Sequence, residues 1–319
     1  MEISVIMSVY NERPEQIKQA IDSILKQTCL PMEFVIVLDN PDQSDLKALL
    51  MSYDHQFDIV KLVLNKKNIG LAASLNKAID LSSGELIARM DADDISISDR
   101  FEVELNELQR RGLDLISGNI SYIDEAGKVV GEKSAIPESA PLIEKILPYG
   151  STIVHPTVLM RKTAVQQAGG YRLLPTAEDY DLWLRMIANG FKIGSINRRV
   201  LSYRLRDNSM TSNAWKTYLV SQYIRKLYSE RRRTGQDTFK VGAPMLLEKL
   251  ADEHACQKFN RGQKYFTMAM QAMQQRKIGW AGYQLLHTMF TSADNFYYVA
   301  NYLCLRIVWL VNRGRYQNV

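Results

Sequence analysis

Short β-branched segments alternate with amphipathic helical segments through the first two thirds of this 319-residue chain, and this alternation restricts its fold more than any other feature. Strands are predicted at residues 3–9, 33–38, 60–64 and 85–90, and helices at 14–27, 45–53, 71–81 and 99–111. The segment EFVIVL at 33–38 is apolar almost throughout, which is typical of a parallel strand buried on both faces. Strands joined by helices of this length form right-handed βαβ units, so we predict an α/β fold with a mostly parallel sheet flanked by helices.

The chain changes character near residue 213. Before this point, further strands are predicted at 115–123, 153–160 and 191–202, with a helix at 176–189. Beyond it the pattern is one of long helices, at 215–233, 244–259, 261–276, 280–290 and 296–311. We therefore predict two domains, an α/β domain at 1–212 and a basic, mostly helical domain at 213–319.

Polar segments follow the first four predicted strands. Open α/β sheets bind ligands outside the carboxyl ends of their strands, so these are the positions to examine. The four segments are SVYNE at 8–12, LDNPD at 38–42, NKKNIGL at 65–71 and RMDADD at 89–94. No GxGxxG follows the first strand and no GxxxxGK[ST] occurs anywhere, so the ligand is held without these glycine-rich phosphate loops.

Three carboxylates lie within four residues at the end of the fourth strand: Asp91, Asp93 and Asp94. They repel one another unless a cation is bound, and residues i and i+2 of an extended segment project to the same side. Asp91 and Asp93 can therefore converge on one ion, and oxygen ligands suit Mg²⁺ or Mn²⁺, which recruit substrate phosphates. The alternative is that Asp93 or Asp94 caps a helix. The position after a buried strand favours the metal site.

A second acidic cluster, TAEDYDLW at 176–183, precedes a predicted helix. The spacing of Thr176 and Asp179 predicts a helix N-cap, and the helix dipole favours acids in a first turn whatever their function. A carboxylate at a helix start that faces a cleft can also act as a general base. The pattern alone leaves both interpretations open.

Six motifs in this order resemble those of the family 2 glycosyltransferases of GT-A fold, most of all the bacterial enzymes that build O-antigen, capsule and exopolysaccharide repeat units. The motifs are SVYNE, VLDN, NIGLAASLN, IARMDADD, HPTVLMR with GGYR, and EDYDLWLR, within about residues 1–212. The resemblance implies inverting transfer of a hexose or N-acetylhexosamine from a UDP-sugar. The acceptor it implies is a hydroxyl of an oligosaccharide or lipid-linked glycan in cell-surface polysaccharide synthesis.

The resemblance also implies roles for single residues. The positions that match its nucleotide-binding segments are Val9, Tyr10, Asn11, Glu12, Asp39, Asn68, Gly70, Asn76 and Asp91. Asp93 matches the direct ligand of Mn²⁺ or Mg²⁺, with Asp91 beside it. Asp179 matches the catalytic base that deprotonates the acceptor hydroxyl, with Glu178 beside it.

The chain departs from the family pattern in two places. The second strand end usually reads DDGS-like, whereas this chain has Asp39 without the first acid. Arg206 stands where many relatives carry a histidine close to the metal and the diphosphate. An arginine does not ligate a cation but pairs with phosphate oxygens, so Arg206 is a candidate phosphate clamp. Arg89, at a strand end, is a second candidate.

Two aromatic residues near the second acidic cluster have structural alternatives. His155, before Pro156, either lines the acceptor cleft or has a structural role, and the sequence leaves both open. Trp183 lies at helical spacing with Met186 and Ile187, which predicts that its ring packs in the core.

The net charge of +5 conceals two opposite halves. Residues 1–197 carry 20 Lys and Arg against 28 Asp and Glu, a net charge of −8, and residues 198–319 carry 20 against 7, a net charge of +13. Basic residues alternate with aromatic ones at 215–233, which suits an interfacial helix on an anionic membrane surface. A homodimer formed through the apolar segment 296–311 is the competing explanation. Nucleic acid ranks last, and we predict no such partner.

The sequence also predicts where the protein works. Its three scattered cysteines indicate a reducing compartment, and its first ten residues begin a strand without a basic leader segment. The apolar segment 296–311 is interrupted by Asn301 and Arg306 and is shorter than the roughly 20 residues of a membrane span. We therefore predict a cytoplasmic protein, peripheral on the inner face of the cell membrane.

Two other functions fit the same fold. A nucleotidyltransferase that makes nucleotide-sugars needs a Gly-rich loop with Lys or Arg after the first strand, and SVYNERPE is not such a loop. A non-catalytic glycan-binding or scaffold protein would not need the acidic motifs that this chain retains.

Overall fold

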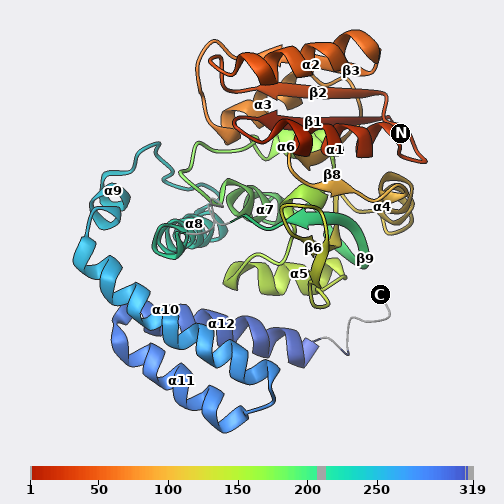
Figure 1. The fold of residues 1–319 in the computed structure, drawn as a ribbon. Coiled ribbons are helices and arrows are strands. Elements are labelled where there is room, and N and C mark those ends of the chain that lie inside the picture. The colour runs from red at the N-terminus through yellow and green to blue at the C-terminus, as the bar shows by residue number, and fades with distance from the viewer. Residues whose placement is uncertain (1, 207–212, 313, 315–319) are drawn as a thin grey trace.

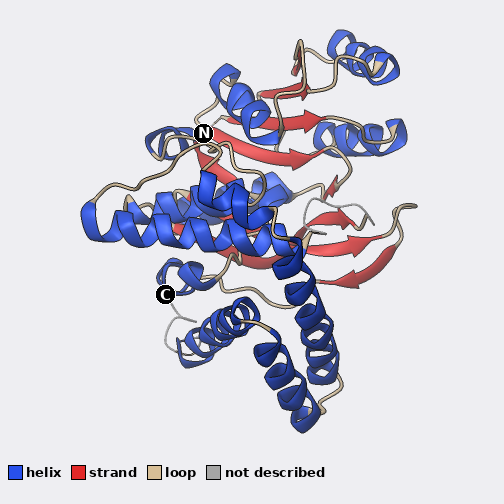
Figure 2. Cartoon of the chain, turned by 90° about the vertical axis from the view of Figure 1, so that its left-hand side faces the viewer, coloured by secondary structure: helices blue, strands red, loops and turns tan. Residues whose placement is uncertain are grey.

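The computed structural model describes residues 2–206, 213–312 and 314, and their strands form one sheet (Figures 1 and 2). The strands are β1 Ile3–Val9, β2 Glu33–Leu38, β3 Val60–Leu64, β4 Leu86–Asp91, β5 Ile95–Ser96, β6 Leu115–Ile123, β7 Val129–Glu132, β8 Leu159–Arg161 and β9 Ile193–Arg204. Their order is β3-β2-β1-β4-β8-β6-β9-β5, with β7 paired to β6. Strands β1 to β4 are parallel to one another, as are β6 and β9, whereas β8 runs antiparallel between β4 and β6. The predicted mostly parallel α/β sheet is confirmed.

Helices cover both faces of the parallel half of the sheet. They are α1 Pro14–Leu25, α2 Ser44–Gln56, α3 Leu71–Leu81 and α4 Arg100–Arg110. Alternate side chains of the central strand enter different cores: Ile6 of β1 joins one apolar cluster, and Val5 and Met7 join the other. All residues of β2 are buried, which explains why this strand reads as a continuous apolar run.

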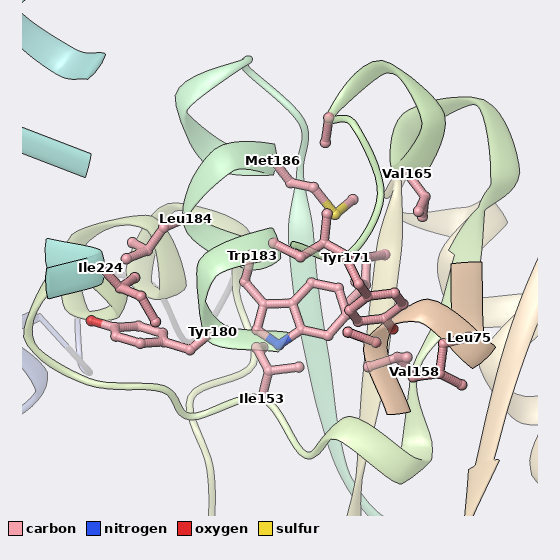
Figure 3. Packing of buried hydrophobic residues seen from close by; sticks show 14 of the residues in the cluster. Leu75, Ile153, Val158, Val165, Tyr171, Tyr180, Trp183, Leu184, Met186 and Ile224 are labelled. Carbon is pink, nitrogen blue, oxygen red and sulfur yellow. The ribbon is translucent and has the colours of Figure 1, made fainter. Parts of the chain in front are cut away.

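The chain between β7 and β9 packs one core around Trp183. Its helices are α5 Ala140–Ile146, α6 Lys162–Gln167 and α7 Glu178–Ala188, with short 3₁₀ turns η1 Leu147–Tyr149 and η2 His155–Thr157. Figure 3 shows the fully buried indole of Trp183 between Tyr171 and Ile153, which confirms the predicted core position. A strand was predicted from residue 153, but Pro156 begins a turn at η2 and the strand starts only at Leu159.

The C-terminal third is helical as predicted, but one boundary differs. The helices are α8 Ala214–Thr234, α9 Pro244–Leu250, α10 Glu253–Gln274, α11 Ile278–Thr291 and α12 Ala293–Asn312. The prediction that one helix ends and the next begins near residue 260 is wrong, because α10 runs through this position. The chain breaks instead before Asp252, whose side chain accepts a hydrogen bond from the Ala255 amide at 2.9 Å and caps α10.

One side of helix α8 is packed against the rest of the protein. Tyr218 is 4% exposed and Leu227 is 1% exposed, and α8 packs beside α7 (Figure 1). Trp215, Tyr218 and Leu227 therefore belong to the core and are not presented to a membrane. Arg232 and Arg233 at the end of α8 are exposed, and membrane contact through this basic segment stays a prediction. Helices α10 to α12 form a second group with a small apolar cluster of their own (Figures 1 and 2). The predicted domain boundary falls beside residues 207–212, which lie outside the described residues, and stays a prediction.

Among the described residues, none of the helices combines the length and the apolar character needed to cross a membrane.

Candidate active site

A cavity of about 950 Å³ opens at the carboxyl ends of β1, β2 and β4 and brings most of the predicted site residues together. Those that line it are Tyr10, Asn11, Glu12, Asp39, Asn68, Gly70, Asp91, Asp93, Glu178, Asp179 and Arg206. Val9 and Asn76 are not among the residues that line the cavity. Val9 is buried in β1, where its carbonyl accepts a hydrogen bond from the Asp39 amide at 2.8 Å.

Asp39 shapes the loop between β3 and α3. Its Oδ1 accepts hydrogen bonds from the Ile69 amide at 2.9 Å and from Asn65 Nδ2 at 2.8 Å. Its Oδ2 accepts one from the Gly70 amide at 2.8 Å. Gly70 has a φ of +84°, a conformation that a side chain would oppose. The carboxylate therefore holds Asn68 and Gly70 in position at the cavity wall.

Asn76 joins α3 to the segment before α7. Its Nδ2 donates to the Tyr171 carbonyl at 2.7 Å, and its Oδ1 accepts from the Tyr171 amide at 2.8 Å. Its amide group is thus engaged with the backbone of Tyr171. The Tyr171 hydroxyl lies 2.9 Å from Nε2 of His155, which lines the cavity. Asn76 therefore influences the site through Tyr171 and His155.

His155 lies in the cavity wall and also packs against the core. It lines the cavity, and its ring contacts both Tyr171 and Trp183, with centroid distances of 5.4 and 5.9 Å. Burial and the nearby Arg89 guanidinium hold the pKa of His155 well below its usual value, so the ring is neutral at physiological pH.

Asp91, Asp93 and Asp94 form what we call the acidic triad: each offers a carboxylate oxygen, and these oxygens lie within 4.8 Å of one another. Arg89 holds Asp91 through both guanidinium nitrogens, at 2.6 and 2.5 Å, so Arg89 is less available to phosphate than its place at a strand end suggested. Asp94 is buried and accepts a hydrogen bond from the Arg204 amide at 2.8 Å, which ties the end of β4 to β9.

The triad fits a hard divalent cation. Its donors are all carboxylate oxygens, and the buried Oδ2 of Asp94 has no hydrogen-bond partner among the described residues. Burial and the neighbouring Asp91 charge raise the pKa of Asp93 to about 6, the sign of repulsion that a cation would relieve. Arg206 stands at the same place: its Nε pairs with Asp93, and its Nη1 lies 3.8 Å from Glu12 Oε1.

The second acidic cluster lies at the start of α7, but Thr176 does not cap the helix as predicted. The cap position is Ala177, a non-glycine residue with a φ of +56°, and no side chain caps this end. Such left-handed backbone occurs at functional sites, where the surroundings hold it in place. It turns the chain so that Glu178 and Asp179 both line the cavity.

These two carboxyl groups have raised pKa values. Burial, followed by the neighbouring Asp179 charge, raises the pKa of Glu178 to about 7. Burial also raises the pKa of Asp179. A carboxylate that binds a proton near neutral pH suits a general base, because its pKa lies close to the working pH.

The far end of the cavity is lined by residues that sequence reasoning missed. They come from the loop at Tyr149, from α8 and from α12, and include Thr217, Arg225, Tyr298, Asn301 and Tyr302. The sequence held one usable signal, since residues 298, 301, 302 and 305 have the spacing of one helical face. Nothing in the sequence indicated that this face meets the cavity.

Comparison with known structures gives the class of fold. The crystal structure of Staphylococcus aureus TarS 1–349 in complex with UDP-GlcNAc superposes with a TM-score of 0.60 at 18% identity, over 98% of this chain and 92% of that chain. This likeness, together with the sheet order and the place of the acidic triad, confirms the GT-A fold.

Sequence comparison gives the family. The model of glycosyl transferase family 2 matches residues 4–168, and the chain belongs to this family. An uncharacterised glycosyltransferase of Methanocaldococcus jannaschii is 32% identical over 234 residues, 72% of this chain and 80% of the relative. The UDP-Gal:α-D-GlcNAc-diphosphoundecaprenol β-1,3-galactosyltransferase of Escherichia coli is 30% identical over 224 residues, 69% of this chain and 80% of that enzyme.

Proposed function

We propose that the protein transfers a hexose or N-acetylhexosamine, with inversion, from a UDP-sugar to a hydroxyl of a lipid-linked glycan during the synthesis of a cell-surface polysaccharide. One observation carries this proposal: a single cavity is lined by the acidic triad, by Arg206 and by two carboxyl groups of raised pKa. The E. coli relative is named for a UDP-sugar donor and a lipid-diphosphate acceptor, which supports these two substrate classes.

The nucleotide lies along the ends of β1, β2 and β4. Tyr10, Asn11, Asp39 and Asn68 line this part of the cavity and surround the uridine. Asp91 and Asp93 would hold Mn²⁺ or Mg²⁺, which neutralises charge on the diphosphate. Arg206 then exchanges its pairing with Asp93 for the phosphate oxygens, to which a guanidinium binds in a bidentate manner.

Asp179 acts on the acceptor. Its carboxylate takes the proton of the acceptor hydroxyl, and the oxygen forms a bond to the anomeric carbon of the donor. The bond from that carbon to UDP breaks, and UDP leaves with the electron pair. Attack from the face opposite to UDP inverts the configuration. Glu178 lies beside Asp179, and its raised pKa lets it bind a proton near neutral pH, which limits the repulsion between the two carboxyl groups.

The experiment that tests this function measures UDP release from a panel of UDP-sugars with Mn²⁺ or Mg²⁺ and lipid-diphosphate acceptors. We expect Asp179→Asn to lower transfer by at least about 10²-fold while UDP binding is unchanged. Asp93→Ala should abolish transfer and also weaken metal-dependent UDP binding. The control is Asp80→Asn, an exposed acid on α3.

Near-normal turnover in Asp179→Asn would remove the base assignment, and Glu178→Gln then tests its neighbour. If the wild-type protein releases no UDP with any sugar, the chain is a non-catalytic glycan-binding or scaffold protein.

We also propose that the protein works as a peripheral protein on the inner face of the cell membrane, bound through the outer face of α11. Trp280, Tyr283 and Phe290 lie on one face of α11 and are 54%, 50% and 87% exposed. Residues 254–293 contain five Lys and Arg and no Asp or Glu, so the charge around this face suits anionic lipid. Helices α10 and α11 extend away from the sheet (Figure 2), which leaves this face accessible.

A further inference from the structure

The cavity continues beyond Glu178 and Asp179 to an end formed by α8, α12 and the loop at Tyr149. We propose that this end is the acceptor subsite and takes a sugar joined to a diphosphate, with the sugar against the tyrosines of α12 and the diphosphate on Arg225 of α8. The inference rests on the proposed function and names the part of the acceptor that the protein recognises.

Two helical faces make this subsite. Thr217, Tyr218, Ser221 and Arg225 line the cavity from α8, and their spacing places them on one side of that helix. From α12 the wall residues are Tyr298, Asn301, Tyr302 and Leu305, at spacings of i, i+3, i+4 and i+7. Because α8 packs against α7, which carries the proposed base, a sugar whose hydroxyl meets Asp179 extends toward these faces.

Contacts with neighbouring elements fix α12 at both ends of the face that lines the cavity. At its start, Asp294 Oδ1 accepts a hydrogen bond from the Tyr218 hydroxyl at 3.0 Å, and the buried Asn295 donates to the Phe259 carbonyl at 3.2 Å. Near its end, a Cβ atom at Gly150 would lie 3.1 Å from Leu305 Cδ1, so glycine allows the helix to approach the loop. These contacts therefore hold the cavity-lining face of α12 in position.

The groups on this wall suit a sugar. Tyrosine rings pack against the C–H faces of a pyranose, while hydroxyl and amide groups exchange hydrogen bonds with its hydroxyls. Thr217 also lines the cavity, and its buried Oγ1 has no hydrogen-bond partner among the described residues. The subsite thus offers both apolar surface and polar contacts.

Arg225 gives the subsite its charge. Among the arginines that line the cavity, Arg89 and Arg206 form salt bridges with Asp91 and Asp93, and the guanidinium of Arg204 donates to three backbone carbonyls and to Gln19. No carboxylate of a described residue forms a salt bridge with Arg225. Its Nη1 donates to the Tyr149 carbonyl at 3.4 Å, and its side chain also makes a hydrogen bond with Tyr180. Both partners are neutral groups, so the positive charge of Arg225 is available to an anion. An arginine that lines a cavity and has no carboxylate partner is suited to bind phosphate oxygens.

The test is calorimetric titration with undecyl N-acetylglucosaminyl diphosphate and with neutral undecyl N-acetylglucosaminide, in the presence of Mn²⁺ and saturating UDP. We expect Arg225→Gln to weaken binding of the diphosphate probe by about 10- to 100-fold, the value of a charge-assisted hydrogen bond, and to change binding of the neutral probe less than about threefold. Arg225→Lys should keep part of the affinity. The control is Arg232→Gln, an exposed arginine on the same helix.

Tyr302→Ala should weaken binding of both probes, because both carry the sugar. Equal affinity of wild type and Arg225→Gln for the diphosphate probe would overturn the inference, as would wild-type binding that does not distinguish the two probes or detects neither. Thermal unfolding confirms that each variant is folded. Failure of the proposed function looks different, because wild-type protein then releases no UDP from any UDP-sugar.

Discussion

Arg89 and Arg206 hold the two acids at the end of β4 in different ways. Arg89 is buried and grips both oxygens of Asp91, so it fixes this carboxylate in one orientation. Arg206 is more exposed and contacts Asp93 and Glu12. In the proposed function, a substrate phosphate replaces an acid as the partner of Arg206, whereas Arg89 keeps its bonds to Asp91. The two arginines therefore differ in function although both neutralise the same cluster.

Replacing Arg206 should weaken binding of the diphosphate group without changing binding of the nucleoside. We expect Arg206→Gln to weaken UDP binding by about 10-fold, because a charge-assisted hydrogen bond to phosphate is lost. Binding of uridine, which has no phosphate, should not change. Equilibrium titration with both ligands checks this prediction, and an equal loss for uridine would show that Arg206 acts by holding the fold.

The raised pKa values at the start of α7 predict a pH dependence. A base works when deprotonated, and burial raises the pKa of Asp179 and, with the Asp179 charge, raises that of Glu178 to about 7. The rate of transfer should therefore fall on the acidic side well above about pH 4, where an ordinary carboxyl group titrates. A profile of kcat against pH for wild type and Glu178→Gln tests this. An acidic limb at about pH 4 in wild type would contradict it.

At the scale of elements, α4 braces the end of β4 through a buried ion pair. Arg100 and Glu104 are both fully buried, with Nε and Oε2 3.0 Å apart. Arg100 also donates from Nη2 to the Arg89 carbonyl at 3.0 Å, one residue before Met90 and two before Asp91. A helix on one face of the sheet thus fixes the strand end that carries the acidic triad.

Replacing one member of this ion pair should destabilise the protein more than replacing both members. Arg100→Met leaves a buried carboxylate without a partner, and we expect a loss of roughly 3–5 kcal/mol in the free energy of unfolding. The double variant Arg100→Met, Glu104→Met should recover most of it. Burial already raises the pKa of Glu104 to about 7, so its charge costs stability as pH rises through that value. The loss in Arg100→Met should therefore be larger at high pH, which urea unfolding across neutral pH measures.

Elements with a strong local pattern could be predicted, and those set by distant contacts could not. The strands β1 to β4 and the residues at their ends follow from apolar runs in the sequence. The left-handed turn at Ala177, the true break before Asp252 and the burial of Tyr218 depend on tertiary packing. For the same reason, the residues that line the cavity at the strand ends could be predicted from the sequence, and those on α8 and α12 could not.

At the scale of the whole molecule, the outer face of α11 predicts binding to anionic membranes. Trp280→Ala with Phe290→Ala removes two exposed aromatic side chains and should abolish flotation with phosphatidylglycerol vesicles at moderate salt. The control is Val129→Ala with Val130→Ala, exposed apolar residues on β7. Wild-type binding that is equal for neutral and anionic vesicles would contradict the charge argument. A change in sedimentation without a change in flotation would assign the face to a homodimer.

On α12 the residues that fix the helix and the residues that line the cavity overlap only in part. Asp294 and Asn295 fix the helix, and Tyr298 and Tyr302 both line the cavity and pack against Phe266 of α10. Asn301 differs from these tyrosines, because its side chain donates to the Tyr297 carbonyl of its own helix, so its exchange alters the wall and leaves the packing of α12 and the strand ends at the other half of the cavity in place. If the proposed acceptor subsite is correct, exchanges at this position can change the bound acceptor over evolution while the strand-end half of the cavity is preserved. The same separation offers a starting point for directing the protein to new glycans.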